Sequence, residues 1–155
     1  MRVLGVDPGK KTGLAVYEDG KLKLLQTVTK EKSIEFIVGS GVDLVVFEDS
    51  RLQSTTFRRT SKNGKPLSAA AQLKIARDVG GIDAQCRDIE AACLAHGIGK
   101  IAISPKQKGA KIDHVQFALK TGWAGSKSNQ HERDSAMVAW GFRLAAANPE
   151  FGAGR

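Results

Sequence analysis

The sequence predicts an α/β fold built on a five-stranded mixed sheet, with the first three strands in an antiparallel meander and helices flanking the sheet. Three short runs rich in Val and Leu open the chain, and the second and third flank Asp19-Gly20, a dipeptide typical of tight hairpins. Two further runs, at residues 42–49 and 100–104, each follow a helical segment, the arrangement that joins parallel strands. We expect a single domain over residues 1–155.

Local signals mark the elements of the first third of the chain. Residues 2–7, RVLGVD, form an apolar strand that ends in the turn DPGKKTG. A short helix at 31–38 opens on acidic residues and closes at Gly39. The strand at 42–49, VDLVVFED, is continuously apolar and β-branched before its acids, which is typical of a strand buried on both faces.

The rest of the chain combines one long loop with helices. The loop at 52–66 is polar and basic, and the helix at 68–96 begins at Ser68 as its N-cap and stops before Gly97. Gly80-Gly81 within this helix costs about 1 kcal/mol per glycine relative to alanine, which predicts a kink or the close approach of another backbone. Two final helices are predicted at 111–121 and 130–147.

Composition narrows the class of protein. Apolar residues make up 41% of the chain and charged residues 26%, as in ordinary globular proteins. No apolar run approaches the roughly 18 residues that span a bilayer, and Asp7 interrupts the N-terminal run, so we expect no membrane association and no signal peptide. The two cysteines, Cys86 and Cys93, lack metal-ligand spacing and favour a reducing, cytoplasmic setting.

The positive charge is concentrated in two segments. Residues 51–77 carry +7 and residues 100–128 carry +5, so the remainder of a chain of net charge +8 carries −4. This division is typical of a protein that holds a polyanion against a separate acidic site. A lysine-rich surface that only confers solubility is an equally good interpretation of the charge alone.

Two acids stand at the ends of predicted parallel strands. Asp7 and Glu48 would meet at the carboxyl edge of the sheet, where ligands of such folds bind, and adjacent carboxylates require a cation. Oxygen ligands of this kind suit Mg²⁺. Asp7 before Pro-Gly is also explained as a turn residue. Asp49 competes with Glu48, but neighbouring strand residues point to opposite faces, so only one shares the face of Asp7.

The last predicted helix adds two further candidate ligands. Asn129 and Glu132 match a capping box, and His131 and Asp134 stack on one helix face at the N-terminal end. The following residues are nearly all apolar, so the helix is expected to be buried below these two side chains. The alternative is that both residues only favour a helix N-terminus, which suits Asp well and a protonated His poorly.

These segments resemble motifs of the RuvC family of Holliday-junction resolvases, in the ribonuclease H-like superfamily. GVDPGKKTG is similar to the first-strand motif of that family, VVFED to the strand carrying its catalytic Glu, and HERDSAMVAW to its closing helix. LKIARDVGG and ISPKQKGAK are similar to its following helix and to a proline-basic segment near the DNA. The resemblance extends from residue 2 to about residue 145.

The resemblance implies a catalytic, metal-binding tetrad of Asp7, Glu48, His131 and Asp134 that uses Mg²⁺, with Mn²⁺ able to substitute. His131 stands where many members have Asp. An aromatic residue that inserts at the junction centre in the family is replaced here by Arg51, with Phe57 as a possible substitute. The remaining expected DNA contacts are all basic: Arg58, Arg59, Lys62, Lys65, Lys106, Lys108 and Lys111.

The implied function is the resolution of four-way DNA junctions by paired, symmetrical nicks, through two-metal-ion hydrolysis. Two symmetrical cuts imply a homodimer, for which the helix at 68–96 is the candidate interface. The alternative is that this helix only covers the sheet. Three other functions stay open at this point: a broader endonuclease for forks and flaps, an RNA nuclease of the YqgF-like group, and a DNA-binding module without catalysis. An actin-like phosphotransferase is disfavoured because that class needs a longer chain of two domains.

Overall fold

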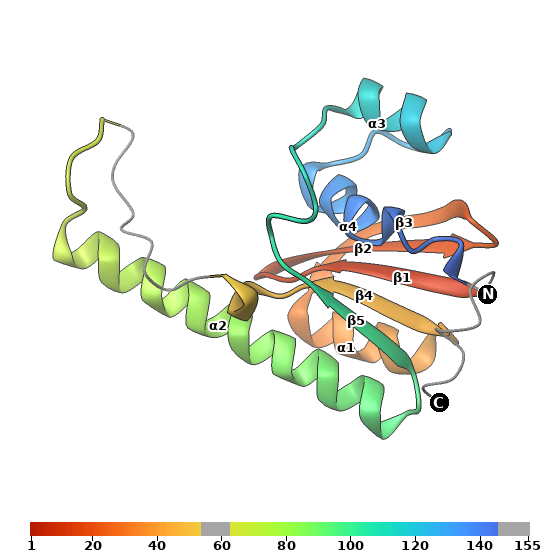
Figure 1. Ribbon diagram of the computed structural model, residues 1–155, viewed down its shortest axis with the longest axis horizontal. Coiled ribbons are helices and arrows are strands. Elements are labelled where there is room, and N and C mark those ends of the chain that lie inside the picture. The colour runs from red at the N-terminus through yellow and green to blue at the C-terminus, as the bar shows by residue number, and fades with distance from the viewer. Residues whose placement is uncertain (54–62, 146–155) are drawn as a thin grey trace.

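The computed structural model describes residues 1–53 and 63–145, and it confirms the predicted sheet. The strands are β1 (Arg2–Asp7), β2 (Lys11–Glu18), β3 (Lys21–Thr29), β4 (Leu44–Glu48) and β5 (Gly99–Ile103), in the spatial order β3-β2-β1-β4-β5. β1 pairs antiparallel with β2 and parallel with β4, and β4 pairs parallel with β5 (Figure 1). The hairpin turn is confirmed, since Asp19 and Gly20 both have positive φ.

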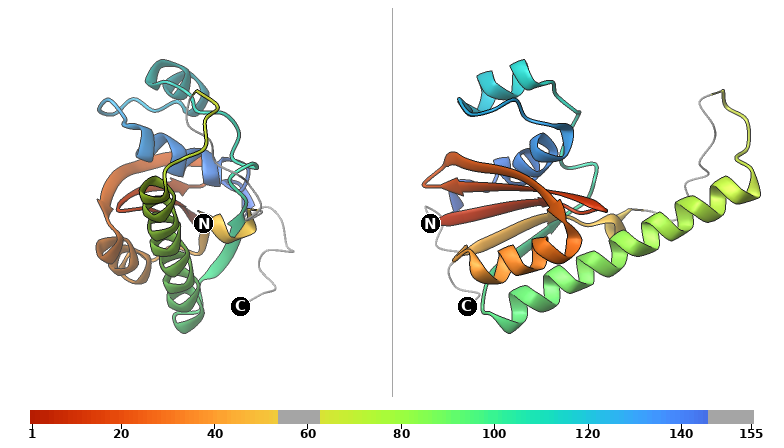
Figure 2. Two further views of the ribbon diagram at one scale, coloured as in Figure 1. Left: turned by 90° about the vertical axis from the view of Figure 1, so that its left-hand side faces the viewer. Right: turned by 180° about the vertical axis from the view of Figure 1, so that it is seen from behind.

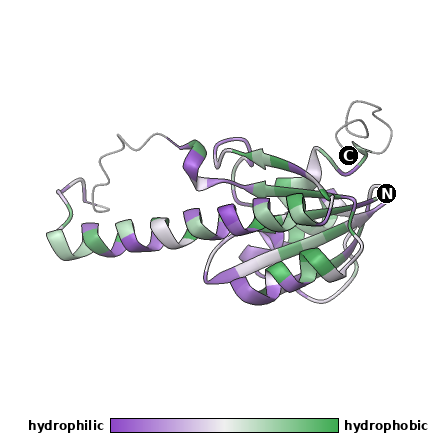
Figure 3. Cartoon of the chain, turned by 90° about the horizontal axis from the view of Figure 1, so that it is seen from below, coloured by the Kyte–Doolittle hydropathy of each residue, from purple (hydrophilic) through white to green (hydrophobic). Residues whose placement is uncertain are grey.

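Helices cover both faces of the sheet. α1 (Lys30–Gly39) and α2 (Ala69–Ala95) lie on one face, and α4 (Gln130–Trp140) lies on the other, with α3 (His114–Thr121) beyond it (Figures 1 and 2). The N-terminal half of α2 projects past the edge of the sheet (Figure 2). Hydrophobic residues gather where the helices meet the sheet, whereas the projecting half of α2 carries both hydrophobic and hydrophilic residues (Figure 3).

The alternation of side chains along β1 and β4 builds two cores. Val3 and Val46 pack on the α4 side, and Leu4 and Phe47 pack on the side of α1 and α2. Because alternate strand residues share a face, Asp7 and Glu48 continue the two rows that point towards α4. The pleat of the sheet therefore decides which side of the molecule receives the acids.

Several predicted boundaries need correction. The last helix ends at Trp140 and not at residue 147, because Gly141 caps it and the chain continues in turns. The preceding helix begins at His114 and not at 111, since Asp113 caps it in a capping box with Gln116. Gly80-Gly81 lie inside an uninterrupted α2. Apart from their chain neighbours and the adjacent backbone of the helix, no heavy atom of the described residues comes within 4 Å of a Cβ added at either glycine.

Within residues 1–53 and 63–145, no helix combines the length and the apolar character that crossing a membrane requires.

Candidate active site

Asp7 and Glu48 end two parallel neighbouring strands and face the same side. Asp7 is the last residue of β1 and Glu48 the last residue of β4, and their side chains are 15% and 18% exposed. The charge of Glu48 acts directly on the pKa of Asp7. The structure thus brings together the two acids that strand order predicted.

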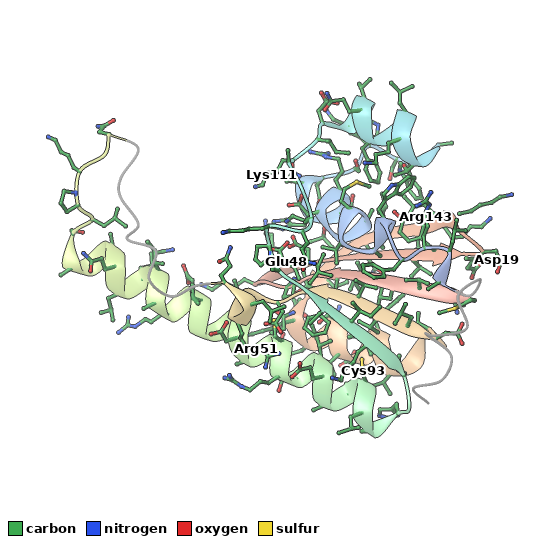
Figure 4. All side chains as sticks on the ribbon, viewed as in Figure 1. Asp19, Glu48, Arg51, Cys93, Lys111 and Arg143 are labelled. Atoms are coloured by element: carbon green, nitrogen blue, oxygen red, sulfur yellow. The ribbon has the colours of Figure 1, made fainter. Side chains whose placement is uncertain are left out.

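Asp49 is directed elsewhere, which resolves its competition with Glu48. Its carboxylate accepts hydrogen bonds from Arg51 Nε at 2.8 Å and from Arg51 Nη2 at 2.7 Å, and Arg51 Nη2 also lies 2.8 Å from Glu90 of α2. The hydrogen bond from Arg51 holds the pKa of the Asp49 carboxyl below its usual range despite burial. Arg51, for which a DNA contact is predicted, forms ion pairs that hold the turn Ser50–Leu52 against α2 (Figure 4).

α4 delivers the other two predicted ligands. His131 Nδ1 lies 3.5 Å from Asp7 Oδ2, and the charge of Asp134 also acts on Asp7. The predicted capping box is confirmed, because Asn129 Oδ1 accepts from the amide of Glu132 and Glu132 Oε2 accepts from the amide of Asn129, both at 3.0 Å. Asn129 Nδ2 further donates to Thr27 Oγ1 of β3 at 2.8 Å, which fixes the N-terminal end of α4 on the sheet.

Two glycines let α4 approach the sheet closely enough to place these ligands. A Cβ at Gly13 would overlap the backbone carbonyl of His131, and one at Gly5 would overlap the carbonyl of Ser135. Gly13 is the register partner of Asp7 across β1 and β2. The absence of a side chain at Gly13 is therefore what allows His131 to sit beside Asp7.

Lys108 lies among the acids, on the segment between β5 and α3. Its Nζ is 2.7 Å from Glu48 Oε2 and 3.7 Å from Asp134 Oδ2, and its side chain is only 12% exposed. Arg133 of α4 donates to the carbonyl of Ile112 at 2.9 Å and so ties this segment to α4. Lys108 was expected as a DNA contact, and its place inside the acidic cluster was not predicted. The available signal is that β5 runs parallel to β4 and delivers its following residues to the same edge.

The cluster of Asp7, Glu48, Asp134 and Lys108 carries an excess of negative charge. Burial raises the pKa of Asp7 to about 6, with Glu48 and Asp134 adding to this effect and Lys108 opposing it. Burial also works against the Lys108 ammonium, but the hydrogen bond to Glu48 and the surrounding carboxylates outweigh it and raise the pKa of Lys108. Three carboxylates face one ammonium, which leaves a net negative site.

The donor set fits a divalent cation chemically. Three carboxylates and one imidazole match the ligand preferences of Mg²⁺ and Mn²⁺. In the described residues no three such side chains are already gathered tightly enough to hold one ion, and Lys108 Nζ lies between two of the acids. A bound cation would take over the neutralising role that the ammonium has here.

The remaining predicted DNA contacts fall into two groups. Those outside the described residues are Phe57, Arg58, Arg59 and Lys62. Those with exposed positions are Lys65, just before α2, and Lys106 and Lys111, which flank Lys108 in the same segment. Figure 4 labels Lys111.

The five-stranded sheet and its strand order define an α/β protein with a ribonuclease H-like fold. No family model matches the sequence, and no curated protein matches it either. Solved structures do match.

The chain is similar to Thermus thermophilus RuvC in complex with a Holliday junction substrate, at 17% identity and a TM-score of 0.62 over 94% of both chains. A second T. thermophilus RuvC structure has 18% identity and a TM-score of 0.62, covering 95% of this chain and 96% of that one. The Fowlpox virus resolvase, in complex with Holliday junction DNA, has 10% identity and a TM-score of 0.54, and the match covers 92% of this chain and 99% of that one. At such low identity the likeness demonstrates a shared fold.

Proposed function

We propose that this protein is a metal-dependent endonuclease that resolves four-way DNA junctions with paired, symmetrical nicks. The observation that carries the proposal is the convergence of Asp7, Glu48 and Asp134 from three separate elements, with His131 beside them, at the carboxyl edge of the sheet. The fold shared with two resolvases solved on Holliday junctions supports the choice of substrate.

The tetrad would hold two divalent cations, Mg²⁺ or Mn²⁺. Held there, such ions would supply an activated water and would offset the charge on the leaving oxygen. β1 is paired on both sides at its tip, with Gly13 opposite Asp7 and Phe47 opposite Val6, so the Asp7 carboxylate is held more firmly than a loop would hold it. That rigidity suits Asp7 to be the shared ligand of the site.

Lys108 has a second part in this proposal. Its ammonium is buried next to the acids and stays charged, because its pKa is raised. With divalent cations held by the tetrad, the Lys108 ammonium would be placed to offset charge on a phosphate drawn to the site. Lys65, Lys106 and Lys111 would hold flanking phosphates, together with the predicted contacts that lie outside the described residues.

A homodimer is part of the proposal, because two symmetrical cuts require two sites related by a twofold axis. The candidate interface is α2, whose N-terminal half projects beyond the sheet (Figure 2). Sedimentation of the protein alone and on junction DNA measures its oligomeric state directly.

A broader activity on forks and flaps is the second candidate. One observation favours it: the residue in the place of the family's junction-centre aromatic is Arg51, which is held by Asp49 and Glu90. A side chain engaged in this way does not insert between bases.

The testing experiment compares wild type with Asp7→Asn on end-labelled four-way junction, Y-fork and linear duplex DNA, with Mg²⁺ or Mn²⁺. Paired nicks on the junction alone, absent in the variant while junction binding persists, would establish a resolvase. Equal cutting of forks would indicate the broader endonuclease. Binding without cleavage by wild type would indicate a non-catalytic module, and cleavage of structured RNA only would indicate a YqgF-like nuclease.

A further inference from the structure

A buried polar network lies beneath the turn that follows Asp7. Gln85 of α2 is 2% exposed, and Thr12 and Ser33 are fully buried. The Gln85 side chain accepts from the amide of Gly9 at 2.9 Å and donates to Thr12 Oγ1 at 2.8 Å. Gln85 Nε2 also lies 3.4 Å from Ser33 Oγ of α1. Three elements that are distant in sequence therefore meet at one amide side chain.

Gln85 lies at a position where the spacing of the buried residues of α2 predicts an apolar side chain. It lies on the same buried face of α2 as Cys86 and Ile89, which pack in the core against α1 and the sheet. An amide at such a position costs free energy unless both of its polar atoms are bonded, and here both are. The residue thus contributes specific hydrogen bonds rather than packing.

The bonds fix the backbone next to Asp7. The Gly9 amide donates to Gln85, and the Gly9 carbonyl accepts from Thr12 Oγ1 at 2.8 Å, so both backbone polar groups of Gly9 are held. Only Pro8 separates Gly9 from Asp7, and the ring of Pro8 restricts its own φ. Holding Gly9 in place therefore limits how far the Asp7 carboxylate can move.

We propose that Gln85 is a positioning residue: it acts through Gly9 and Thr12 to hold the Asp7 carboxylate in place for divalent-cation binding, and it ties that carboxylate to α2. The inference rests on the proposed function because it assumes that the site binds a divalent cation. It does not depend on the DNA that the protein cuts. Removing a residue that hydrogen-bonds a metal ligand directly typically weakens metal binding by about 10- to 100-fold. Gln85 acts one step further away, through Gly9, so we expect an effect at the lower end of that range.

The test uses Gln85→Met, which keeps the volume and the helix but removes both hydrogen bonds. Mn²⁺ binding is measured without DNA, by electron paramagnetic resonance of free Mn²⁺, and the Gly9 amide is followed by hydrogen exchange in metal-free protein. We expect about tenfold weaker Mn²⁺ binding and faster exchange at Gly9. The control is Ile89→Ala, on the same buried face of α2, which should lose stability and leave both readouts unchanged.

A second pair of variants guards against a Gln85→Met protein that does not fold. Thr12→Val removes the hydroxyl that links Gln85 to Gly9, and Thr12→Ser keeps it. Thr12→Val should weaken Mn²⁺ binding in the same direction, and Thr12→Ser should restore wild-type affinity.

Equal Mn²⁺ affinity in wild type, Gln85→Met and Thr12→Val, including no binding by any of them, would overturn the inference. An equal loss in Ile89→Ala would overturn it as well. Selective loss of Mn²⁺ binding in a protein that cuts no DNA would sustain the inference while the proposed function fails, so the two failures are distinguishable.

Discussion

Asp7→Asn should stabilise the metal-free protein at neutral and alkaline pH, although it removes the central ligand of the site. The structure holds Asp7 among Glu48, Asp134 and Lys108 in a half-buried cluster, and burial is the main cause that raises its pKa from 3.8 to about 6. A raised pKa means that the folded protein binds this proton more tightly than the unfolded chain. Stability from this group is therefore fully present below about pH 4 and is lost as the pH rises through about 6.

The expected gain in the free energy of unfolding follows from the size of the pKa shift of Asp7. Moving the pKa from 3.8 to about 6 corresponds to roughly 3 kcal/mol, at about 1.4 kcal/mol per pH unit. Solvent reaches 15% of the side chain, so we expect a gain of about 2–3 kcal/mol for Asp7→Asn at pH 8. Near pH 3 the protonated acid and the amide are close in shape and charge, and the two proteins should be equally stable.

The assay is urea unfolding of both proteins in EDTA at unit steps from pH 3 to pH 8. Asp49→Asn is the matched control with the opposite sign, because Arg51 lowers the pKa of Asp49, so that variant should be less stable at pH 8 than wild type. Saturating Mn²⁺ should reverse the order of wild type and Asp7→Asn, since only wild type retains the full site. A difference that is constant with pH, or an Asp7→Asn protein less stable at pH 8 in EDTA, would refute the reasoning.

Three further predictions concern the surroundings of the site. Gly13→Ala should force α4 away from β2, which lowers stability in thermal unfolding by about 1–3 kcal/mol and slows cleavage. In the same unfolding assay, Gly80→Ala on the open side of α2 should stabilise the protein by up to about 1 kcal/mol. Lys108→Met should slow junction cleavage yet tighten Mn²⁺ binding without DNA, because the ammonium no longer neutralises Glu48. Calorimetry that shows weaker Mn²⁺ binding, or the same change in Lys106→Met, would contradict this prediction. Junction affinity should fall steeply between about 50 and 200 mM salt, and Lys111→Ala should reduce the slope of log K against log salt by about 1, with an unchanged slope counting against phosphate contact.

Local patterns in the sequence predicted most of the fold. Asp19-Gly20 specified the hairpin because both positions need positive φ, and Asn129 with Glu132 specified the start of α4 because the two side chains cap neighbouring amides. The pairing of Asp7 with Glu48 was also predictable, since parallel strands bring their carboxyl ends to one edge. The end of α4 was missed because residues 142–145 keep the apolar composition of the helix but form turns.

The sequence by itself determined which residues end the strands and begin the helices, and so which acids reach the sheet edge. Only the tertiary structure decided that the Lys108 ammonium lies against Glu48 and that the Gln85 amide holds the turn after Asp7. Capping and pleating act over a few neighbouring residues and leave a local signal in the sequence. The Lys108 and Gln85 contacts join groups 60 and 76 residues apart, and they depend on how closely a helix or a loop packs against the sheet, which no local pattern encodes.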